Sequence, residues 1–319
     1  MFRNFTVIFG LLIGIVGASA QDWPQRSVKL VVPYPAGGGT DIVARVLAQK
    51  LGDTLGQRFI VENKSGASGM VGAQSVAKGE ADGYTFLVAS PAEIALNQYL
   101  FKEMTYDPLK DLTPVTLLAW TPLVLAAHPT FAASNLSELI ALARREPVDF
   151  STPGTGSSHQ LAGEYINKRE STRLVHVPYR GAAPAVADAV GGHVKLTISG
   201  MPPVVQFLES GALKAIAVTS KRRSPKFPNI PTMAETAGLE DADFTNWFGV
   251  LARTGTPQPI VDNMAKAAGE ALKDPKVQDI LASQAAVPVG NTPSEFRDFI
   301  RSEAMKYARI VELTGVKGE

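Results

Sequence analysis

VKLVVPYPAGGGTDIVARVLAQKL, residues 28–51, decides the fold class, because a strand pattern, a glycine-rich loop and a helix pattern follow one another directly. Residues 28–32 are apolar and mostly β-branched, which is typical of a buried strand. Apolar residues then recur on one face of 40–51, where Thr40 suits the N-cap and Gly52 the stop. This strand, loop and helix predict a sheet covered by helices.

The same alternation continues outward along the chain. It predicts strands at 59–61 and 84–88, then a second set near 150 and at 174–177, 194–198 and 213–218, with helices between them. The apolar stretch 115–127, interrupted by Pro122, is longer than a typical strand, and we interpret it as a strand that passes between two lobes. The predicted class is α/β, with two lobes that are each a mostly parallel sheet flanked by helices, joined by a hinge beside an interlobe cleft.

The C-terminal part of the chain decides where the lobes begin and end. Helices expected at 259–272, 275–283 and 293–313 each begin at a proline, which suits the first helical turn. If they pack back on the first lobe, that lobe is discontinuous, with residues 21–123 plus 248–319, and the second lobe is 124–247. A separate small helical domain at the C-terminus is the alternative.

The first twenty residues predict export. Arg3 is followed by an apolar run over 5–16 and then by Ala18-Ser19-Ala20, which is the pattern of a secretory signal peptide, residues 1–20, with its cleavage site. The apolar run is shorter than the roughly 20 residues that a membrane-spanning helix needs. We therefore expect a periplasmic protein that begins near Gln21 and keeps no membrane anchor.

Composition excludes several classes of protein. The 319 residues include no cysteine, which rules out a disulfide framework, a thiolate metal site, a cysteine nucleophile and a lipidated cysteine. The 31 basic and 30 acidic residues balance once Arg3 is removed with the signal, so no nucleic-acid partner or anionic membrane is indicated. Attraction of a ligand must then come from a local feature of the cleft.

Three strand-to-helix loops carry that local feature: 32–41, 150–161 and 177–184. Glycines let the backbone approach a ligand closely, and the first amides of a helix are unpaired donors at its positive end, so such a loop can bind an anion. Ligands of doubly wound sheets lie beyond the carboxyl ends of the strands, which places the loops around one cleft. The simpler alternatives are ordinary turns and N-caps. Arg180 could hold a carboxylate or pair with solvent or an aspartate.

Other kinds of site, for nucleotides, hydrolysis or metals, require residues that these loops lack. Loop 32–41 has no lysine for a phosphate-binding P-loop, and Ile42 stands where a dinucleotide fingerprint needs its third glycine. There is no G-x-S-x-G elbow, and the four histidines show no H-E-x-x-H pair. We predict no enzyme activity, no catalytic residue, no cofactor and no metal; a serine hydrolase using Ser157 or Ser158 with His159 is the enzyme alternative.

Six motifs together resemble a known family: VPYPAGGGTD (32–41), QRFIVENKSGASG (57–69), ADGYTFL (81–87), GTGSSHQL (154–161), VPYRGAAPAVADAVGG (177–192) and NIPTMAE (229–235). The chain resembles the substrate-binding proteins of tripartite tricarboxylate transporters, also called the Bordetella uptake-gene family. The resemblance implies a type II-like periplasmic binding fold that closes on a small mono- or dicarboxylic acid and delivers it to membrane permease subunits. It also implies a monomer; a ligand-presenting sensor for a signalling receptor is the alternative role.

By motif position, the resemblance implies which residues contact the ligand through loop amides and hydroxyls. Arg180 stands where the family often has lysine, and Asp41, beside an anion site, is expected to cap helix amides or to accept from a ligand amine or a water. The implied ligand-binding residues are Tyr34, Ala36, Gly37, Gly38, Thr40, Asp41, Ser90, Thr152, Gly154, Ser157, Ser158, His159, Tyr179 and Gly181.

Overall fold

The structure is a computed structural model that describes residues 23–318, so the predicted signal peptide, 1–20, lies outside the described residues. The strands run in the order β2-β1-β3-β9-β4-β7-β5-β6, and β10 and β8 also pair with β4. Their bounds are β1 Val28–Val32, β2 Phe59–Asn63, β3 Thr85–Ala89, β4 Leu112–Ala127, β5 Val148–Thr152, β6 Leu174–Pro178, β7 Leu196–Gly200, β8 Lys214–Val218, β9 Thr245–Arg253 and β10 Val287–Pro288.

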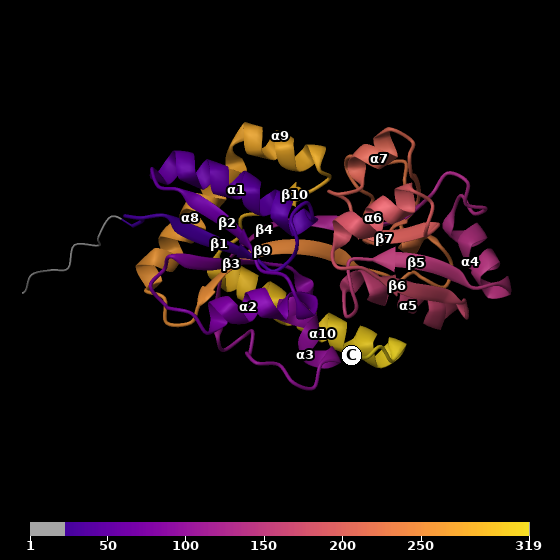
Figure 1. Ribbon diagram of the computed structural model, residues 1–319, viewed down its shortest axis with the longest axis horizontal. Coiled ribbons are helices and arrows are strands. Elements are labelled where there is room, and N and C mark those ends of the chain that lie inside the picture. Colours follow the sequence, from indigo (N-terminus) through magenta and orange to yellow (C-terminus); the bar gives the residue numbers. More distant parts are fainter. Residues whose placement is uncertain (1–22, 319) are drawn as a thin grey trace, which may run out of the picture.

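Helices flank these strands (Figure 1). A π-helical turn, η2, follows β3, and short 3-10 segments, η1 and η3, lie in two of the loops. The bounds are α1 Gly39–Leu55, η1 Ala67–Gly69, α2 Met70–Ala77, η2 Ala92–Leu96, α3 Asn97–Leu100, α4 Leu136–Arg145, α5 Ser158–Glu170, α6 Ala182–Val190, α7 Val205–Glu209, η3 Met233–Glu235, α8 Gln258–Lys273, α9 Pro275–Ser283 and α10 Pro293–Thr314.

Strand β4 belongs to both lobes. Its residues Leu112 to Pro122 pair with β9, whereas Leu123 to Ala127 pair with β7 and β8. We call the part built on β2, β1, β3, β9 and β10 lobe 1, and the part built on β6, β5, β7 and β8 lobe 2. Both lobes lie along the long axis in Figure 1, with β4 and β9 running between them. The boundaries 21–123 plus 248–319 and 124–247 remain our proposal for the two lobes.

The predicted α/β, two-lobed class is confirmed, but the sheets are more mixed than predicted. Strand β1 pairs in parallel with β2 and β3, and β5 pairs in parallel with β6 and β7. In contrast, β4 is antiparallel to every neighbour, and β9 is antiparallel to β3. The reason is that the chain crosses between the lobes once in each direction, so the two crossing strands, β4 and β9, run opposite ways.

The C-terminal helices pack against the sheets instead of forming a domain of their own. Helix α8 contacts β4 and α1, and α9 contacts α1. Helix α10 contacts η2 and β4 and also reaches α5 in lobe 2. This packing contradicts the alternative of a separate helical domain at the C-terminus.

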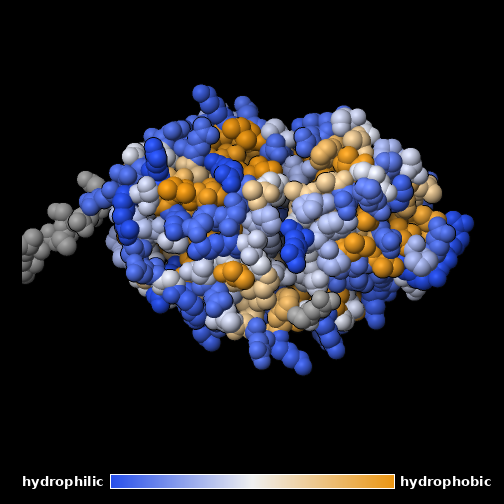
Figure 2. All heavy atoms as spheres, viewed as in Figure 1, coloured by the Kyte–Doolittle hydropathy of each residue, from blue (hydrophilic) through white to orange (hydrophobic). Residues whose placement is uncertain are grey.

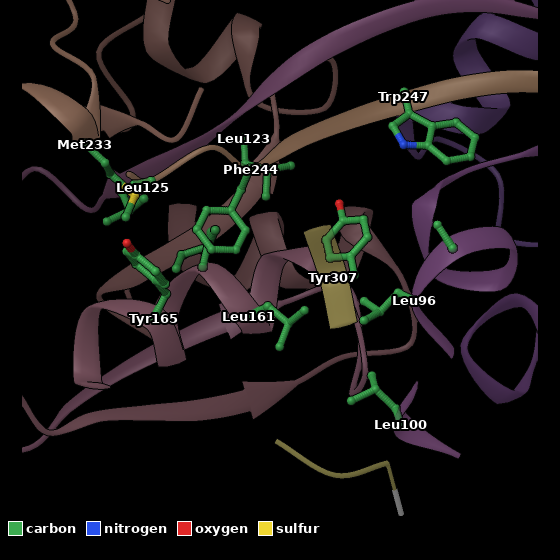
Figure 3. Packing of buried hydrophobic residues seen from close by; sticks show 14 of the residues in the cluster. Leu96, Leu100, Leu123, Leu125, Leu161, Tyr165, Met233, Phe244, Trp247 and Tyr307 are labelled. Atoms are coloured by element: carbon green, nitrogen blue, oxygen red, sulfur yellow. The ribbon is translucent and has the colours of Figure 1, made fainter. Parts of the chain in front are cut away.

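One hydrophobic core runs continuously beneath both lobes (Figure 3). Tyr307 of α10 lies in it between Leu96 and Leu100 of lobe 1 and Leu161 and Phe244 of lobe 2, and Tyr307 is fully buried. The C-terminal helix therefore supports both sides of the interlobe region from below.

The surface in Figure 2 carries hydrophobic residues in separate small patches over both lobes, not in one continuous band. Among the described residues, no helix combines the length and the apolar character needed to cross a membrane.

Candidate functional site

A cavity of about 70 Å³ lies between the two lobes. A water needs about 10–15 Å³ on this measure, so the cavity has room for roughly five to seven water-sized positions. Residues from both lobes line it: Tyr34, Pro35, Gly38, Gly39, Thr40, Ser68, Ser90, Pro91, Ala92, Pro153, Gly154, Thr155, Ser157, Ser158, His159, Ala182, Gly200, Pro203 and Asn246.

The entrance of helix α1 forms part of the lobe 1 wall. Strand β1 ends at Val32 and the helix begins at Gly39, so the glycine-rich loop turns the chain over a few residues. Gly38 is the N-cap and has no side chain to bond the first amides, which leaves them free as donors at the positive end of the helix. Gly38, Gly39 and Thr40 all line the cavity.

Asp41 stabilises this loop from inside the protein. Asp41 is 3% exposed, and its carboxylate accepts from the Gly37 amide at 3.0 Å, from Arg45 Nε at 2.9 Å and from Asn63 Nδ2 at 3.0 Å. Burial alone would raise the pKa of Asp41, but these hydrogen bonds outweigh it and lower that pKa. Asp41 therefore does not cap the amides of α1, as the sequence led us to expect, but binds an amide of the preceding loop, and it lies outside the cavity lining.

The entrance of helix α5 forms the facing wall in lobe 2. Ser157 is the N-cap: its hydroxyl donates to the Gly154 carbonyl at 2.7 Å and accepts from the Gln160 amide at 3.2 Å. Gly156, next in the loop, has a φ of 72°, a left-handed conformation that favours glycine. The free amides of this helix entrance open on the same cavity as those of α1.

His159 is the most unusual side chain in the lining. It is 7% exposed, and its Nδ1 has no hydrogen-bond partner among residues 23–318. Burial lowers the pKa of His159 to about 3, so the imidazole is neutral at physiological pH. A neutral imidazole can offer a donor or an acceptor to a ligand, depending on its tautomer.

The serine hydrolase alternative finds no support in this geometry. The Ser157 hydroxyl is occupied as an N-cap, and within the described part of the chain His159 makes no hydrogen bond to either serine. A nucleophile and its base are ordinarily within hydrogen-bonding reach. Residues 23–318 also contain no group of His, Asp or Glu side chains able to hold a metal.

Helix α6 contributes the third entrance. Its N-cap, Gly181, has no side chain to bond the helix amides, and Ala182 lines the cavity. The Gly181 amide donates to the Pro153 carbonyl at 2.9 Å, which ties this entrance to the loop that precedes α5. Arg180 is exposed and outside the lining, so it is not a carboxylate partner in this cavity.

Eight of the residues expected to bind ligand line the cavity: Tyr34, Gly38, Thr40, Ser90, Gly154, Ser157, Ser158 and His159. The other six lie outside the lining: Ala36, Gly37, Asp41, Thr152, Tyr179 and Gly181.

Two of these six have polar groups engaged elsewhere. The Thr152 hydroxyl bonds His176 Nε2 at 2.6 Å, and the Tyr179 hydroxyl donates to Asp188 Oδ2 at 2.6 Å. For all fourteen residues, contact with a ligand stays a prediction.

Sequence reasoning missed two lining residues that lie on strands, Gly200 and Asn246. Gly200 is the last residue of β7, so the rule that ligands lie beyond the carboxyl ends of strands could have found it. Asn246 of β9 is a buried amide with no such signal, because its position follows from where the second crossing strand meets the cavity.

The electrostatics of the lining are unusual for a site that faces solvent through a cleft. Within residues 23–318, the lining includes no lysine, arginine, aspartate or glutamate. Positive potential therefore comes from the entrances of α1, α5 and α6, whose dipoles place partial positive charge at the cavity. The arrangement suits a small anion that is recognised by hydrogen bonds.

The two lobes touch across the cavity. Ser68 Oγ of lobe 1 donates to the Thr155 carbonyl of lobe 2 at 2.6 Å. A side chain at Gly181 would meet the Pro35 ring at 3.1 Å, so the α1 and α6 loops also approach closely.

Comparison with known proteins identifies the family of the chain. Residues 43–316 match the family model described as "Tripartite tricarboxylate transporter family receptor". Protein BugT of Bordetella pertussis is 39% identical over 99% of both chains. The solved structure "R. palustris Rpa4515 with adipate" is 34% identical with a TM-score of 0.89, covering 93% of this chain and 99% of that one.

A second solved structure, "MatC (Rpa3494) from Rhodopseudomonas palustris with bound malate", is 31% identical with a TM-score of 0.84 and covers 91% of this chain and all of that one. The family match spans most of the chain, and the family resemblance read from the sequence motifs is confirmed. The chain therefore belongs to the tripartite tricarboxylate transporter receptor family, whose members are periplasmic solute-binding proteins.

Proposed function

We propose that this protein captures a small mono- or dicarboxylic acid in the interlobe cavity and delivers it to a tripartite tricarboxylate-type membrane transporter. The observation that carries the proposal is the convergence of three helix entrances, those of α1, α5 and α6, on one cavity whose described lining has no charged side chain. Backbone amides at such entrances bind carboxylates without a counter-charge.

Size and resemblance both favour a short acid. A cavity of about 70 Å³ fits an acid of a few carbons better than a nucleotide or an oligosaccharide. Two similar proteins are described with adipate and with bound malate, which are short dicarboxylates.

Thermal unfolding with a panel of acids tests ligand capture. A ligand present at about 100 times its Kd stabilises the folded state by about 2.7 kcal/mol. Adipate, malate, succinate and citrate are compared with adipamide, which keeps the length of adipate and lacks its charge. We expect at least one acid, and not adipamide, to raise the melting temperature; no shift with any acid would contradict the proposal.

A displaced helix entrance provides the matched variant. Gly39 lines the cavity, and in Gly39→Val the new Cβ lies 3.1 Å from the buried Phe248 ring, so the entrance of α1 must shift and the thermal shift with acid should disappear. In Gly52→Ala, on the same helix, the nearest atom to the new Cβ is 3.5 Å away, an ordinary contact, so the shift remains.

Delivery to the transporter is tested in cells. Bacteria that lack this protein should lose uptake of the bound acid, and the wild-type gene should restore it where Gly39→Val does not. Export is tested on the strain that carries the restored wild-type gene. If residues 1–20 are removed, the periplasmic product should have the mass of a chain that begins at Gln21. Unchanged uptake in the deletion strain would count against the transport role.

A further inference from the structure

A buried carboxylic acid, Glu93, lies directly behind the cavity wall in lobe 1. It belongs to η2, follows strand β3 and is 0% exposed. Its Oε2 accepts from the Tyr34 hydroxyl at 2.7 Å and from the Ser90 hydroxyl at 3.1 Å, and its Oε1 accepts from the Ser90 amide at 2.6 Å. Tyr34 and Ser90 line the cavity, and we call the three residues the Glu93 cluster.

The protein closes tightly around this cluster. A Cβ at Gly69 would lie 3.0 Å from Glu93 Oε2 and 3.0 Å from the Tyr34 hydroxyl, and the φ of Gly69 is 86°. Glycine is thus required there by both space and backbone conformation. Because Gly69 fills one side of the cluster, we take the cavity to be the side from which a ligand can reach the Tyr34 and Ser90 hydroxyls.

The hydrogen atoms of the cluster limit what it can offer a ligand. Tyr34 and Ser90 each have one hydroxyl proton, and Ser90 Oγ also lies 3.1 Å from the Tyr34 hydroxyl. While Glu93 is ionised, it can only accept, so both hydroxyl protons stay within the cluster and the cavity meets oxygen lone pairs. Lone pairs accept from a hydroxyl or an amide, but they repel a carboxylate.

A proton on Glu93 changes what the cluster offers. Protonated Glu93 donates to one of the two hydroxyl oxygens, and the proton of that hydroxyl then becomes free to bond a carboxylate in the cavity. No covalent bond changes; one proton moves from solvent to Glu93 Oε2.

Within the described chain, no cation reaches Glu93 to hold it ionised. The loop after β1 contributes Tyr34 and η1 contributes Gly69, and helix α3, which packs against η2, has no charged residue. Tyr106 donates to the Glu93 backbone carbonyl at 2.6 Å.

Helix α10 also packs against η2, and its one buried charged side chain among the described residues, Glu303, is engaged elsewhere. Its Glu303 bonds Lys306 at 2.6 Å and the Trp247 indole at 3.1 Å, while Tyr307 is uncharged. Burial raises the pKa of Glu93 to about 7, although the hydrogen bonds from Tyr34 and Ser90 act in the opposite direction.

We propose that Glu93 is a specificity-determining residue of the cavity: a ligand carboxylate binds at the Tyr34–Ser90 end together with one proton, whereas a ligand hydroxyl binds there without one. This inference rests on the proposed function, because it assumes that the other end of the acid is held at the helix entrances. It divides ligands into two classes, diacids with proton-linked affinity and hydroxy acids without it.

The sign of the pH dependence follows from charge. A second carboxylate beside Glu93 is a like charge, so it raises the pKa of Glu93 and binding takes up a proton. Above the pKa of the empty site, the affinity for a diacid should then fall about tenfold per pH unit. The affinity for a hydroxy acid should stay nearly level over the same range.

Isothermal titration calorimetry with matched ligands tests the inference. Adipate and 6-hydroxyhexanoate have the same length and differ at one end; succinate and 4-hydroxybutanoate are the shorter pair. Titration at a mildly alkaline pH, in buffers of different ionisation enthalpy, counts the protons bound with each ligand. We expect about one proton with the diacid and about none with the hydroxy acid.

Variants locate the proton. Glu93→Gln keeps an acceptor for the Ser90 amide and adds a donor for the hydroxyls, so it should bind diacids without proton uptake and with no pH slope. Asp188→Asn alters another tyrosine–carboxylate pair, at Tyr179, which lies outside the lining. This control variant should keep the proton uptake and the pH slope of diacid binding. If Glu93→Gln does not fold, the wild-type proton count still decides.

The two proposals fail in different ways. Diacid binding with no proton uptake overturns the role of Glu93 and leaves carboxylate capture intact. Proton uptake on diacid binding that persists in Glu93→Gln also overturns the role of Glu93. If neither member of either pair binds, nor any acid of the panel, the proposed function fails and this inference fails with it.

Discussion

The two walls of the cavity use their buried polar groups in opposite ways. In lobe 1, Asp41 accepts three hydrogen bonds and Glu93 accepts three, all from groups of the same lobe. In lobe 2, His159 is equally buried, yet its Nδ1 has no partner among residues 23–318. Since a satisfied group holds its neighbours in place and an unsatisfied one costs free energy, lobe 1 is preorganised and lobe 2 gains most from a ligand.

The largest effect should come from breaking the preorganised wall. Asp41→Asn replaces one carboxylate oxygen by an NH2 group, which cannot accept from the N–H groups around it. The free energy of unfolding should therefore fall by about 2–3 kcal/mol. Urea unfolding measures it. Asp53→Asn, at an exposed position on the same helix, should change stability by less than about 0.5 kcal/mol.

The Asp41 effect should also depend on pH. Because the folded state lowers the pKa of Asp41, its contribution is fully present above the unfolded value of about 3.9 and is lost as pH falls through the folded value. The difference between wild type and Asp41→Asn should therefore shrink in acid below about pH 4. A constant difference across that range would show that shape, not charge, stabilises the loop.

A smaller effect, on affinity, should come from the unsatisfied wall. His159→Phe removes a buried nitrogen without a partner, so the stability of the ligand-free protein should stay level or rise by up to about 1 kcal/mol. Affinity for the acid should fall about tenfold, because the ligand loses a hydrogen bond. Urea unfolding and calorimetry measure the two quantities.

His176 is the matched control for His159. It bonds the Thr152 hydroxyl at 2.6 Å and packs on the Phe150 ring, outside the cavity lining. His176→Phe should thus lower stability and leave affinity nearly unchanged. If His159→Phe behaves in the same way, His159 is a structural residue and the contrast between the walls fails.

The smallest effect should come from the contact between the walls. Residues 67 and 68 have φ values of 45° and 51°, a conformation that costs free energy in a residue other than glycine, and this loop carries Ser68 to the Thr155 carbonyl. Ser68→Ala removes the hydrogen bond across the cavity and should weaken acid binding by about threefold to tenfold. Ser65→Ala, exposed in the same loop, should bind normally, and equal losses in both variants would exclude a specific contact.

The sequence predicts the local elements of the fold better than the pairing between distant strands. The strand, loop and helix of 28–51 form as expected, because the period of apolar residues is a local property. The predicted caps are wrong: Gly38, not Thr40, is the N-cap, and the helix continues through Gly52 to Leu55, where Gly56 ends it. The crossing strand was also predictable, since 115–127 was too long for one lobe, and β4 does pair in both. The antiparallel pairing of β4 and β9 was missed, because it depends on the direction of two crossings far apart in the chain.

For the site, the sequence by itself determined the loops and their chemistry: glycines before a helix leave amides free wherever the loop lies. Only the tertiary structure decided which side chains face the cavity. Asp41 and Thr152 bond within their own lobes, while Asn246 reaches the lining from a crossing strand. Glu93 meets Tyr34 across 59 residues of chain, and such a meeting depends on packing between strands, which no local pattern encodes.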